Sequence, residues 1–188
     1  AVYVDTVSRV FALLERAYST PRVASAVRDW WRLAGITDKL SETYIGGGNW
    51  LNAFWRTMVR DQSIDEMNHG HRLTAGNNHD FEQWWKMAMG DRLDETAGQA
   101  RSRQFQLEVS TALSGQRLFL TQNGYMGLGL PEVGDEIHVL ASGDVPFILR
   151  FDPKSSHYRL IGDCYLHGIM DGEAMEGWEE NKKTIILC

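Results

Sequence analysis

The sequence has few cysteines, no long apolar run and no excess of positive charge, and each absence excludes a class of protein. Only two of its 188 residues are cysteines, which is too few for a disulfide framework and predicts a reducing, cytoplasmic setting. No apolar run approaches the roughly 20 residues that a membrane-spanning helix needs, and the first residues carry charges where a signal peptide would be apolar. The net charge is −6, and Lys and Arg are scattered rather than clustered. We therefore expect no membrane and no nucleic-acid partner.

The hydrophobic residues are numerous enough for a real core, and their spacing predicts a helical first half. With 188 residues and a hydrophobic content of 43%, the chain can bury roughly 70% of the surface that its unfolded form exposes. Apolar residues recur every three or four positions from the start, which predicts a first helix. Its apolar face would comprise Val4, Val7, Phe11, Leu14 and Tyr18. The chain begins at Ala1 inside this pattern, without Met, so we expect further sequence upstream.

Capping and turn residues divide the rest of this half into further helices. Thr20-Pro21 is typical of a helix start, Gly35 of a helix end, and Asn49 of a cap after a glycine-rich connector. We expect helices from about residue 20 to 34 and 49 to 61, a short one from Asn78 or Asp80, and a last one from about 91 to 113. Residues 63–79 are polar with little periodicity and predict a long loop, either functional or mobile.

After Gly115 the apolar spacing changes to a period of two, which predicts short strands. Asn123-Gly124 favours a type I′ hairpin turn within the first strand pair. A second pair would join 136–141 to 145–151, with Pro146 at an edge position or a strand start, and a third would join 157–161 to 164–169. Five or six short strands in about 60 residues favour a small closed barrel. The predicted fold class is α+β: a helical region at 1–115 and a small β-barrel module at 116–188, packed as one unit.

The segment from Gln116 to Ala174 carries an ordered string of motifs. It contains RLFLT at 117–121, GYMGLG at 124–129, GDEI at 134–137, VPFILR at 145–150, YRLIG at 158–162 and YLHGIMDGEA at 165–174. This pattern closely resembles the C-terminal region of fungal heterokaryon-incompatibility (HET-domain) proteins, without their N-terminal HET domain. Leu130 and Asp163 depart mildly from it. The segment 50–57 and the block 81–85 are similar to the family in a looser way.

The resemblance implies a recognition or regulatory role rather than a reaction. HET proteins resemble intracellular self/non-self recognition factors in fungi, whose HET domain, similar to TIR domains, triggers growth arrest or programmed cell death. The family pattern assigns no catalytic residues to this region. We expect a non-enzymatic module that contacts a protein partner or the missing HET effector domain. The alternative is an enzyme or small-molecule-binding protein with an aromatic-lined pocket between the helices and the β unit.

Two constellations could carry chemistry, and for each we favour a structural interpretation. His69, His71 and His79, near Glu66, Asp80 and Glu82, have the donor types of a metal site, but their spacing is loose and a solvated polar loop is favoured. Cys164 and His167, with Asp171 or Glu173, could form a nucleophile, a base and an orienting group. Because positions 164 and 167 face opposite sides of a strand, a buried structural cysteine is favoured. We predict no cofactor and no metal.

The remaining candidates are a loop, two glycines and the tryptophans. The Met170–Glu173 loop could bind a cation or an arginine such as Arg150, although anchoring the barrel end is favoured. The glycines of Gly127-Leu128-Gly129 are interpreted as bends that let a barrel close. The adjacent pairs Trp30-Trp31 and Trp84-Trp85 cannot both face one core, so one member of each should lie at a junction or a partner surface. The predicted ligand or partner contacts are Trp31, Trp55, Arg56, Trp84, Arg150, His167, Asp171 and Glu173.

Overall fold

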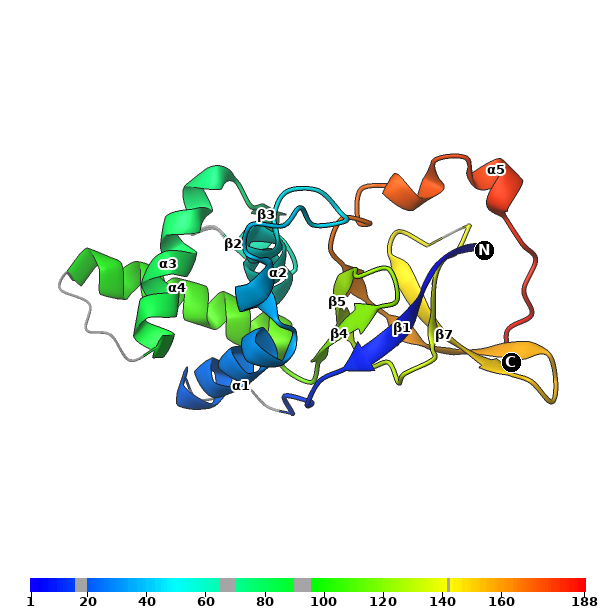
Figure 1. Cartoon of the computed structure of the whole chain (residues 1–188), viewed down its shortest axis with the longest axis horizontal. Helices are drawn as coiled ribbons and strands as arrows, with labels where there is room; N and C mark the ends of the chain where they lie inside the picture. The colour runs from blue at the N-terminus through cyan, green and yellow to red at the C-terminus, as the bar shows by residue number, and fades with distance from the viewer. Residues whose placement is uncertain (16–19, 65–69, 90–95, 142) are drawn as a thin grey trace.

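Most helices lie at one end of the molecule and the large sheet at the other, as Figure 1 shows. The computed structural model describes residues 1–15, 20–64, 70–89, 96–141 and 143–188. The helices are α1 (Thr20–Leu33), α2 (Trp50–Met58), α3 (Asn78–Met89), α4 (Thr96–Leu113) and α5 (Trp178–Asn181), with short 3₁₀ turns η1 (Ile36–Lys39), η2 (Ala75–Asn77) and η3 (Glu173–Met175). The strands are β1 (Val2–Val10), β2 (Gln62–Ile64), β3 (Gly70–Arg72), β4 (Arg117–Thr121), β5 (Met126–Gly129), β6 (Glu136–Val139), β7 (Pro146–Asp152), β8 (His157–Asp163) and β9 (Tyr165–Leu166).

The expected helices α1 to α4 are present, with modest differences at their ends. Gly35 follows α1 with a φ of 69°, the left-handed conformation that glycine adopts at a helix end. The side chain of Asn49 caps α2 by accepting a hydrogen bond of 2.8 Å from the Asn52 N–H. The expected long loop at 63–79 instead contains the hairpin of β2 and β3, and α2 ends at Met58 rather than near Asp61. Residues 91–95 of the last predicted helix lie outside the described residues.

The prediction of a first helix from the start of the chain is wrong, because residues 2–10 form strand β1. This strand pairs with β4 on one edge and with β6 on the other. Its register shifts twice, between Tyr3 and Asp5 and between Val7 and Arg9. A β-bulge inserts one residue and changes the local spacing of inward-facing side chains from two to three. The two bulges therefore gave an apolar spacing that imitates a helix, although the β-branched residues of this segment favour a strand.

The seven-stranded sheet has the order β8-β7-β6-β1-β4-β5-β9 and is not closed. The expected closed barrel is therefore not found. The two edge strands are nevertheless consecutive in the chain: Asp163 of β8 pairs with Phe147, and Leu166 of β9 pairs with Gly127. Three residues of chain span at most about 11 Å. The sheet must therefore curl until its two edges approach each other at this end.

Two details of the strand pairing differ from the predictions. The turn between β4 and β5 has positive φ at Gly124 alone (97°), so it is not a type I′ turn. The Gly124 N–H donates to the Thr121 carbonyl at 3.2 Å, which fits a three-residue loop with glycine in the last position. The expected third hairpin does not form, since β8 pairs with β7 and β9 with β5. The pairing of β6 with β7 is confirmed, and Pro146 begins β7.

Alternation along β4 divides the buried residues between two cores. Leu118 and Leu120 belong to a core shared with α1 to α4, so these helices cover one face of the sheet. Phe119 points to the opposite, concave face, where it joins a second core. That core comprises Val7, Phe119, Ile137, Ile148, Cys164, Leu166 and Ile169. The sheet is therefore buried on both faces around β4.

Gly127 makes room for the aromatic ring at the centre of the second core. A Cβ added there would lie 2.4 Å from Phe119 Cζ and 2.6 Å from the Tyr165 carbonyl oxygen. At Gly129 it would lie 2.8 Å from Ile148 Cδ1. These glycines were expected as bends, but what the structure requires of them is space for the Phe119 ring and its neighbours.

We expect Gly127→Ala to lower the free energy of unfolding by about 1–3 kcal/mol, because the new methyl overlaps a ring and a backbone carbonyl that cannot both move away. The matched control is Gly162→Ala in β8, where an added Cβ meets nothing within 4 Å and φ is not positive. Its effect should stay within about 0.5 kcal/mol. Urea denaturation followed by circular dichroism measures both, and equal effects would contradict this account of Gly127.

Candidate functional site

A chain of alternating charges links the helices to the sheet, and we call it the junction cluster: Arg56, Asp61, Arg72 and Asp171, with His167 beside them. Arg56 Nη1 lies 2.5 Å from Asp61 Oδ1, and Arg72 Nη1 lies 3.2 Å from the other carboxylate oxygen of Asp61. Arg72 Nη2 also pairs with Asp171 Oδ1. The cluster contains two positive and two negative charges, and each lies beside at least one charge of opposite sign.

The backbone that follows α2 places Asp61 for this role. Arg60 and Asp61 both have positive φ (54° and 55°), so the chain reverses immediately after the helix. The Asp61 N–H donates to the Arg56 carbonyl at 2.7 Å, which turns the aspartate back toward the arginine one helical turn earlier. The chain then enters β2, whose partner β3 supplies Arg72. A tight reversal and a hairpin thus present three of the charged groups to the 171 loop.

His167 is largely buried next to this cluster and is held neutral. Its Nδ1 lies 2.7 Å from the Tyr165 hydroxyl, and its ring centroid lies 5.5 Å from that of Tyr44. Burial, together with the nearby Arg56 and Arg72, lowers the pKa of His167 to about 4, although Asp61 and Glu173 oppose the shift. Burial also raises the pKa of the Tyr165 hydroxyl, which therefore stays protonated. The pair is an uncharged hydrogen-bonded unit at neutral pH.

Tyr44 joins the η1–α2 connection directly to the sheet. Its buried hydroxyl accepts a hydrogen bond of 2.7 Å from the Met126 N–H and donates one of 3.3 Å to the His167 carbonyl. Gly46 packs on Gly168 so closely that a Cβ on Gly168 would lie 2.5 Å from Gly46 Cα. Through its side chain, Tyr44 therefore links the helical part to both β5 and the segment after β9, at the place where these two pair.

The structure brings four of the predicted contacts together at this place: Arg56, His167, Asp171 and Glu173. Glu173 Oε2 accepts a hydrogen bond of 2.8 Å from the Asp171 N–H, which fixes the loop that carries Asp171. The loop does pair with an arginine, but Asp171 binds Arg72 and not Arg150, the example that the sequence suggested. These groups serve one another as partners, so the arrangement joins two parts of the molecule.

Arg150 lies in a different part of the sheet. Its guanidinium makes a two-pronged contact with the buried Asp135, at 2.7 and 2.8 Å, and pairs with Glu132 at 2.9 Å. The hydrogen bonds to Asp135 raise its pKa above the ordinary arginine value. Asp135 also accepts from the Glu132 N–H at 2.8 Å. Arg150 therefore anchors β7 to the 130–135 turn and is not part of the junction cluster.

The predicted tryptophans lie mainly in the helical core. Trp84 is fully buried and its Nε1 donates to Gln106 Oε1 at 2.7 Å, while Trp55 stacks on Phe81 with ring centroids 5.6 Å apart. Trp31 is half-buried, and its centroid lies 5.0 Å from that of Trp85. In each adjacent pair one indole is buried and the other is partly exposed, but the partly exposed one packs against the same helical core rather than at a separate junction. The two half-buried members contact each other rather than the sheet.

The other candidate constellations receive no support as sites. Within the described ranges no group of three His, Cys, Asp or Glu side chains could hold a metal ion, and His69 and Glu66 lie outside those ranges. Cys164 is buried as expected, and burial raises the pKa of its thiol, so the reactive thiolate is disfavoured. Of the helices described, none is long and apolar enough to cross a membrane.

The sequence analysis missed Tyr44, Asp61, Arg72 and Tyr165. Asp61 and Arg72 were hidden in a stretch without periodicity, where only a predicted hairpin would have set them opposite each other. Tyr44 had a weak signal, since it lies two residues before three glycines that permit a close approach. Its partner backbone lies more than 80 residues away, and local pattern carries no information about that distance.

The chain combines helices and a sheet with the motifs described above, and comparison with known proteins assigns it to a family. Residues 75–186 match the Het-6 beta-barrel domain, and because this is more than half of the chain, the protein belongs to that family. A curated relative is heterokaryon incompatibility protein 6, OR allele, of Neurospora crassa, which is 42% identical over 65 residues. That alignment covers 32% of this chain and 10% of the relative, so the chain spans a small part of the relative's length. No solved structure gives a significant match. The resemblance of the C-terminal motifs to fungal HET proteins is confirmed.

We expect Tyr44→Phe to lower the free energy of unfolding by about 1–3 kcal/mol, since it leaves the Met126 N–H and the His167 carbonyl without their partner in a buried place. The control is Tyr3→Phe, which removes an exposed hydroxyl bonded to Thr6 Oγ1 at 2.8 Å and should change stability by less than about 0.5 kcal/mol. Thermal and urea unfolding of the two variants measure the difference. A Tyr44→Phe protein as stable as the parent would exclude the bridging role.

The free energy of unfolding should decrease as the pH is lowered, because of His167. Its folded pKa of about 4 lies below the ordinary value of 6.5, so the unfolded chain takes up the proton first as the pH falls. Above about pH 6.5 His167 makes its full contribution to the free energy of unfolding, which is at most about 3 kcal/mol. This contribution is lost progressively as the pH falls to about 4. We expect His167→Asn to weaken this pH dependence and the exposed His71→Asn to leave it unchanged. Some dependence should remain, since burial lowers the pKa of His138 in the same direction.

Proposed function

We propose that this chain is a non-enzymatic recognition and regulatory module of a fungal heterokaryon-incompatibility protein, which contacts a HET effector domain or another protein partner. The Het-6 family match and the Neurospora relative support a role in incompatibility. The non-enzymatic character is our own inference, and it rests on how the polar and apolar groups are used.

The observation that carries this proposal is an aromatic face on the convex side of the sheet, opposite the second core. We call Tyr3, His138, Phe151, Tyr158 and Leu160 the outer face. Ring centroids lie 5.5 Å apart from Tyr3 to His138, 5.5 Å from His138 to Tyr158 and 5.1 Å from Tyr158 to Phe151. Tyr3, Phe151 and Leu160 are 44%, 44% and 46% exposed. Protein interfaces are enriched in aromatic residues that are already held in place.

A buried hydrogen-bonded pair orders this face from below. His138 is buried between Tyr3 and Tyr158, and its Nε2 lies 2.8 Å from Glu136 Oε2. The same carboxylate oxygen accepts from the Tyr158 hydroxyl at 3.1 Å. Burial lowers the pKa of His138, so the ring is neutral in the folded protein. A rigid apolar surface loses little conformational entropy when a partner covers it, which favours binding.

The junction cluster supports the same role. Its arginines, aspartates and histidine are paired with one another, and Cys164 is buried, so these groups are engaged in holding the molecule together. This pairing favours a structural use of the polar residues over a chemical one. The cluster would also transmit a strain on the 171 loop to α2 and the other helices, which suits a module that reports binding to an effector.

The proposal predicts that the outer face contributes to binding of an effector domain. Purified chain and the HET domain of an incompatibility protein from the same source would be tested by biolayer interferometry. We expect Phe151→Ser with Leu160→Ser to weaken binding about ten-fold or more, since these are two of the exposed apolar side chains of the outer face.

The matched control is Leu107→Ser, an apolar residue that is 63% exposed on α4, which belongs to the helical part of the molecule (Figure 1). It should leave affinity within about two-fold of the parent. Circular dichroism would show that each variant is folded. Absence of binding by the parent chain, or an equal loss in the control, would refute the assignment of this face to effector recognition.

A further inference from the structure

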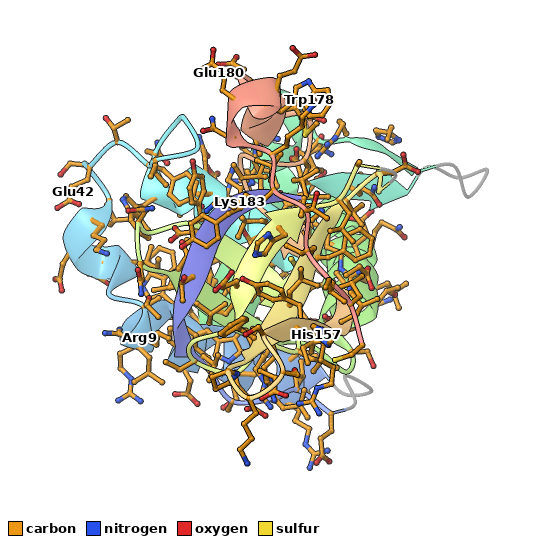
Figure 2. All side chains as sticks on the ribbon, turned by 90° about the vertical axis from the view of Figure 1, so that its right-hand side faces the viewer. Arg9, Glu42, His157, Trp178, Glu180 and Lys183 are labelled. Carbon is orange, nitrogen blue, oxygen red and sulfur yellow. The ribbon has the colours of Figure 1, made fainter. Side chains whose placement is uncertain are left out.

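A cavity of about 440 Å³ lies where the C-terminal segment crosses the end of the sheet, and no residue of the junction cluster lines it. Strand residues form its floor, and η3, α5 and the segment after α5 form its other walls. Its lining residues include Val2, Val139, Met175, Trp178, Lys182 and Lys183. Figure 2 shows α5 with Trp178 at the top and the following segment running past Lys183 toward His157. Volumes of roughly 300–1,000 Å³ are typical of small-molecule sites, which often occupy the open ends of curled sheets.

The segment that covers this cavity is fixed at both of its ends. Lys182 forms a bridge with Val2 of β1, and Leu187 forms a parallel bridge with Tyr158 of β8. The Tyr158 N–H also donates to the Ile186 carbonyl at 2.8 Å. Between these attachments the segment spans the end of the sheet. The cavity therefore lies beneath a segment that backbone contacts hold at both ends.

The charged side chains that line the cavity are of one sign. Lys182 and Lys183 line it, and none of its lining residues is acidic. The Lys182 ammonium lies 4.8 Å from the centre of the Trp178 ring, and the field of Lys183 contributes to the lowered pKa of His138. Glu180 lies on the far side of α5 from Lys183 in Figure 2. A chain with a net charge of −6 thus presents a local positive rim at this cavity.

The walls below that rim are apolar. Val2, Val139, Met175 and Trp178 line the cavity with aliphatic and aromatic surface. A smaller neighbouring cavity of about 340 Å³ shares Val2 and Lys183 with it and extends to Ile169 of the second core. The ligand that fits such a space has an apolar body of about ten carbon atoms or fewer and one anionic group.

We propose that this cavity binds a small amphiphilic carboxylate, whose anionic group pairs with Lys182 and Lys183 and whose aliphatic chain lies against Val2, Val139 and Trp178. Bound ligand fastens η3 and α5 to β1. The site is distinct from the aromatic pocket between helices and sheet that the sequence suggested. It shares no side chain with the outer face, so it stands or fails separately from effector recognition.

The test uses octanoate as the probe, octanol as its uncharged analogue and acetate as an anion without a chain. Isothermal titration calorimetry measures affinity, and the indole ¹H–¹⁵N signal of Trp178 reports the location. That signal is assigned with Trp178→Phe, Trp178 being the single tryptophan after residue 85. We expect octanoate to bind and shift this signal, octanol to bind more weakly, and acetate not to bind.

Two variants separate the two parts of the site. Lys182→Gln with Lys183→Gln should weaken octanoate binding about five-fold or more, because exposed ion pairs each contribute modestly, and should change octanol binding by less than about two-fold. Ala141→Phe, which fills the cavity from an exposed lining position, should weaken both about ten-fold. Thermal unfolding verifies that both variants are folded. If Ala141→Phe fails to fold, the lysine variant and the Trp178 signal still decide the outcome.

Three results would overturn the proposal. One is the absence of octanoate binding by the parent chain. Another is octanoate binding that neither variant alters. The third is binding to phosphatidylglycerol vesicles without binding of monomeric octanoate, which would indicate a lipid surface rather than an enclosed ligand.

Discussion

Backbone hydrogen bonds on both edges of β1 hold the two halves of the large sheet together. Val7 pairs with Thr121 of β4 on one side, and Thr6 pairs with Glu136 of β6 on the other. Without β1, the facing edges of β4 and β6 would expose unpaired N–H and carbonyl groups in the middle of the sheet. The family match begins at residue 75 and so excludes this strand. The matched region thus depends on a strand supplied by a distant part of the same chain.

That dependence explains how the helices come to lie against the sheet. The chain leaves β1, forms α1 to α4 and returns directly into β4, the neighbour of β1, so both ends of the helical part are fixed at adjacent positions. Leu14 and Gln116 form a bridge at this entry and exit point. Tyr44 and the junction cluster then bind the far side of the helices to β5 and to the loop after β9. The helical part is attached at both ends and at its side, which limits its freedom to move relative to the sheet.

Local pattern was sufficient wherever a feature had a local cause. Gly35, Asn49 and Pro146 marked real element boundaries, because a left-handed residue, a side-chain cap and a missing N–H act within a few residues. The motifs from Arg117 to Ala174 identified the family for the same reason, since they follow the chain. Sequence spacing failed for β1, where two bulges disguised the period of a strand. It also failed for strand partners, because β9 follows β8 directly and yet pairs with β5.

The candidate site shows the same division. Arg56, His167, Asp171 and Glu173 were chosen for their chemical types and do converge, whereas Arg150 and Trp84 were chosen for the same reason and serve other contacts. What distinguishes the two groups is the partner: Asp61 and Arg72 for the first, Asp135 and Gln106 for the second. Partners are fixed by tertiary contacts between segments remote in sequence. The type of a side chain therefore indicates which interactions it can make, and the fold determines which group is its partner.

The first residues of β1 connect the outer face with the cavity. Val2 lines the cavity, and the next residue, Tyr3, belongs to the outer face. The C-terminal segment makes the same connection from above, since Lys182 is bridged to Val2 and Leu187 to Tyr158. A ligand that pulled Lys183 toward the sheet would act on a segment whose other end is hydrogen-bonded to Tyr158, a ring of the outer face. If both sites are used as proposed, a single short stretch of backbone forms part of each and physically links them.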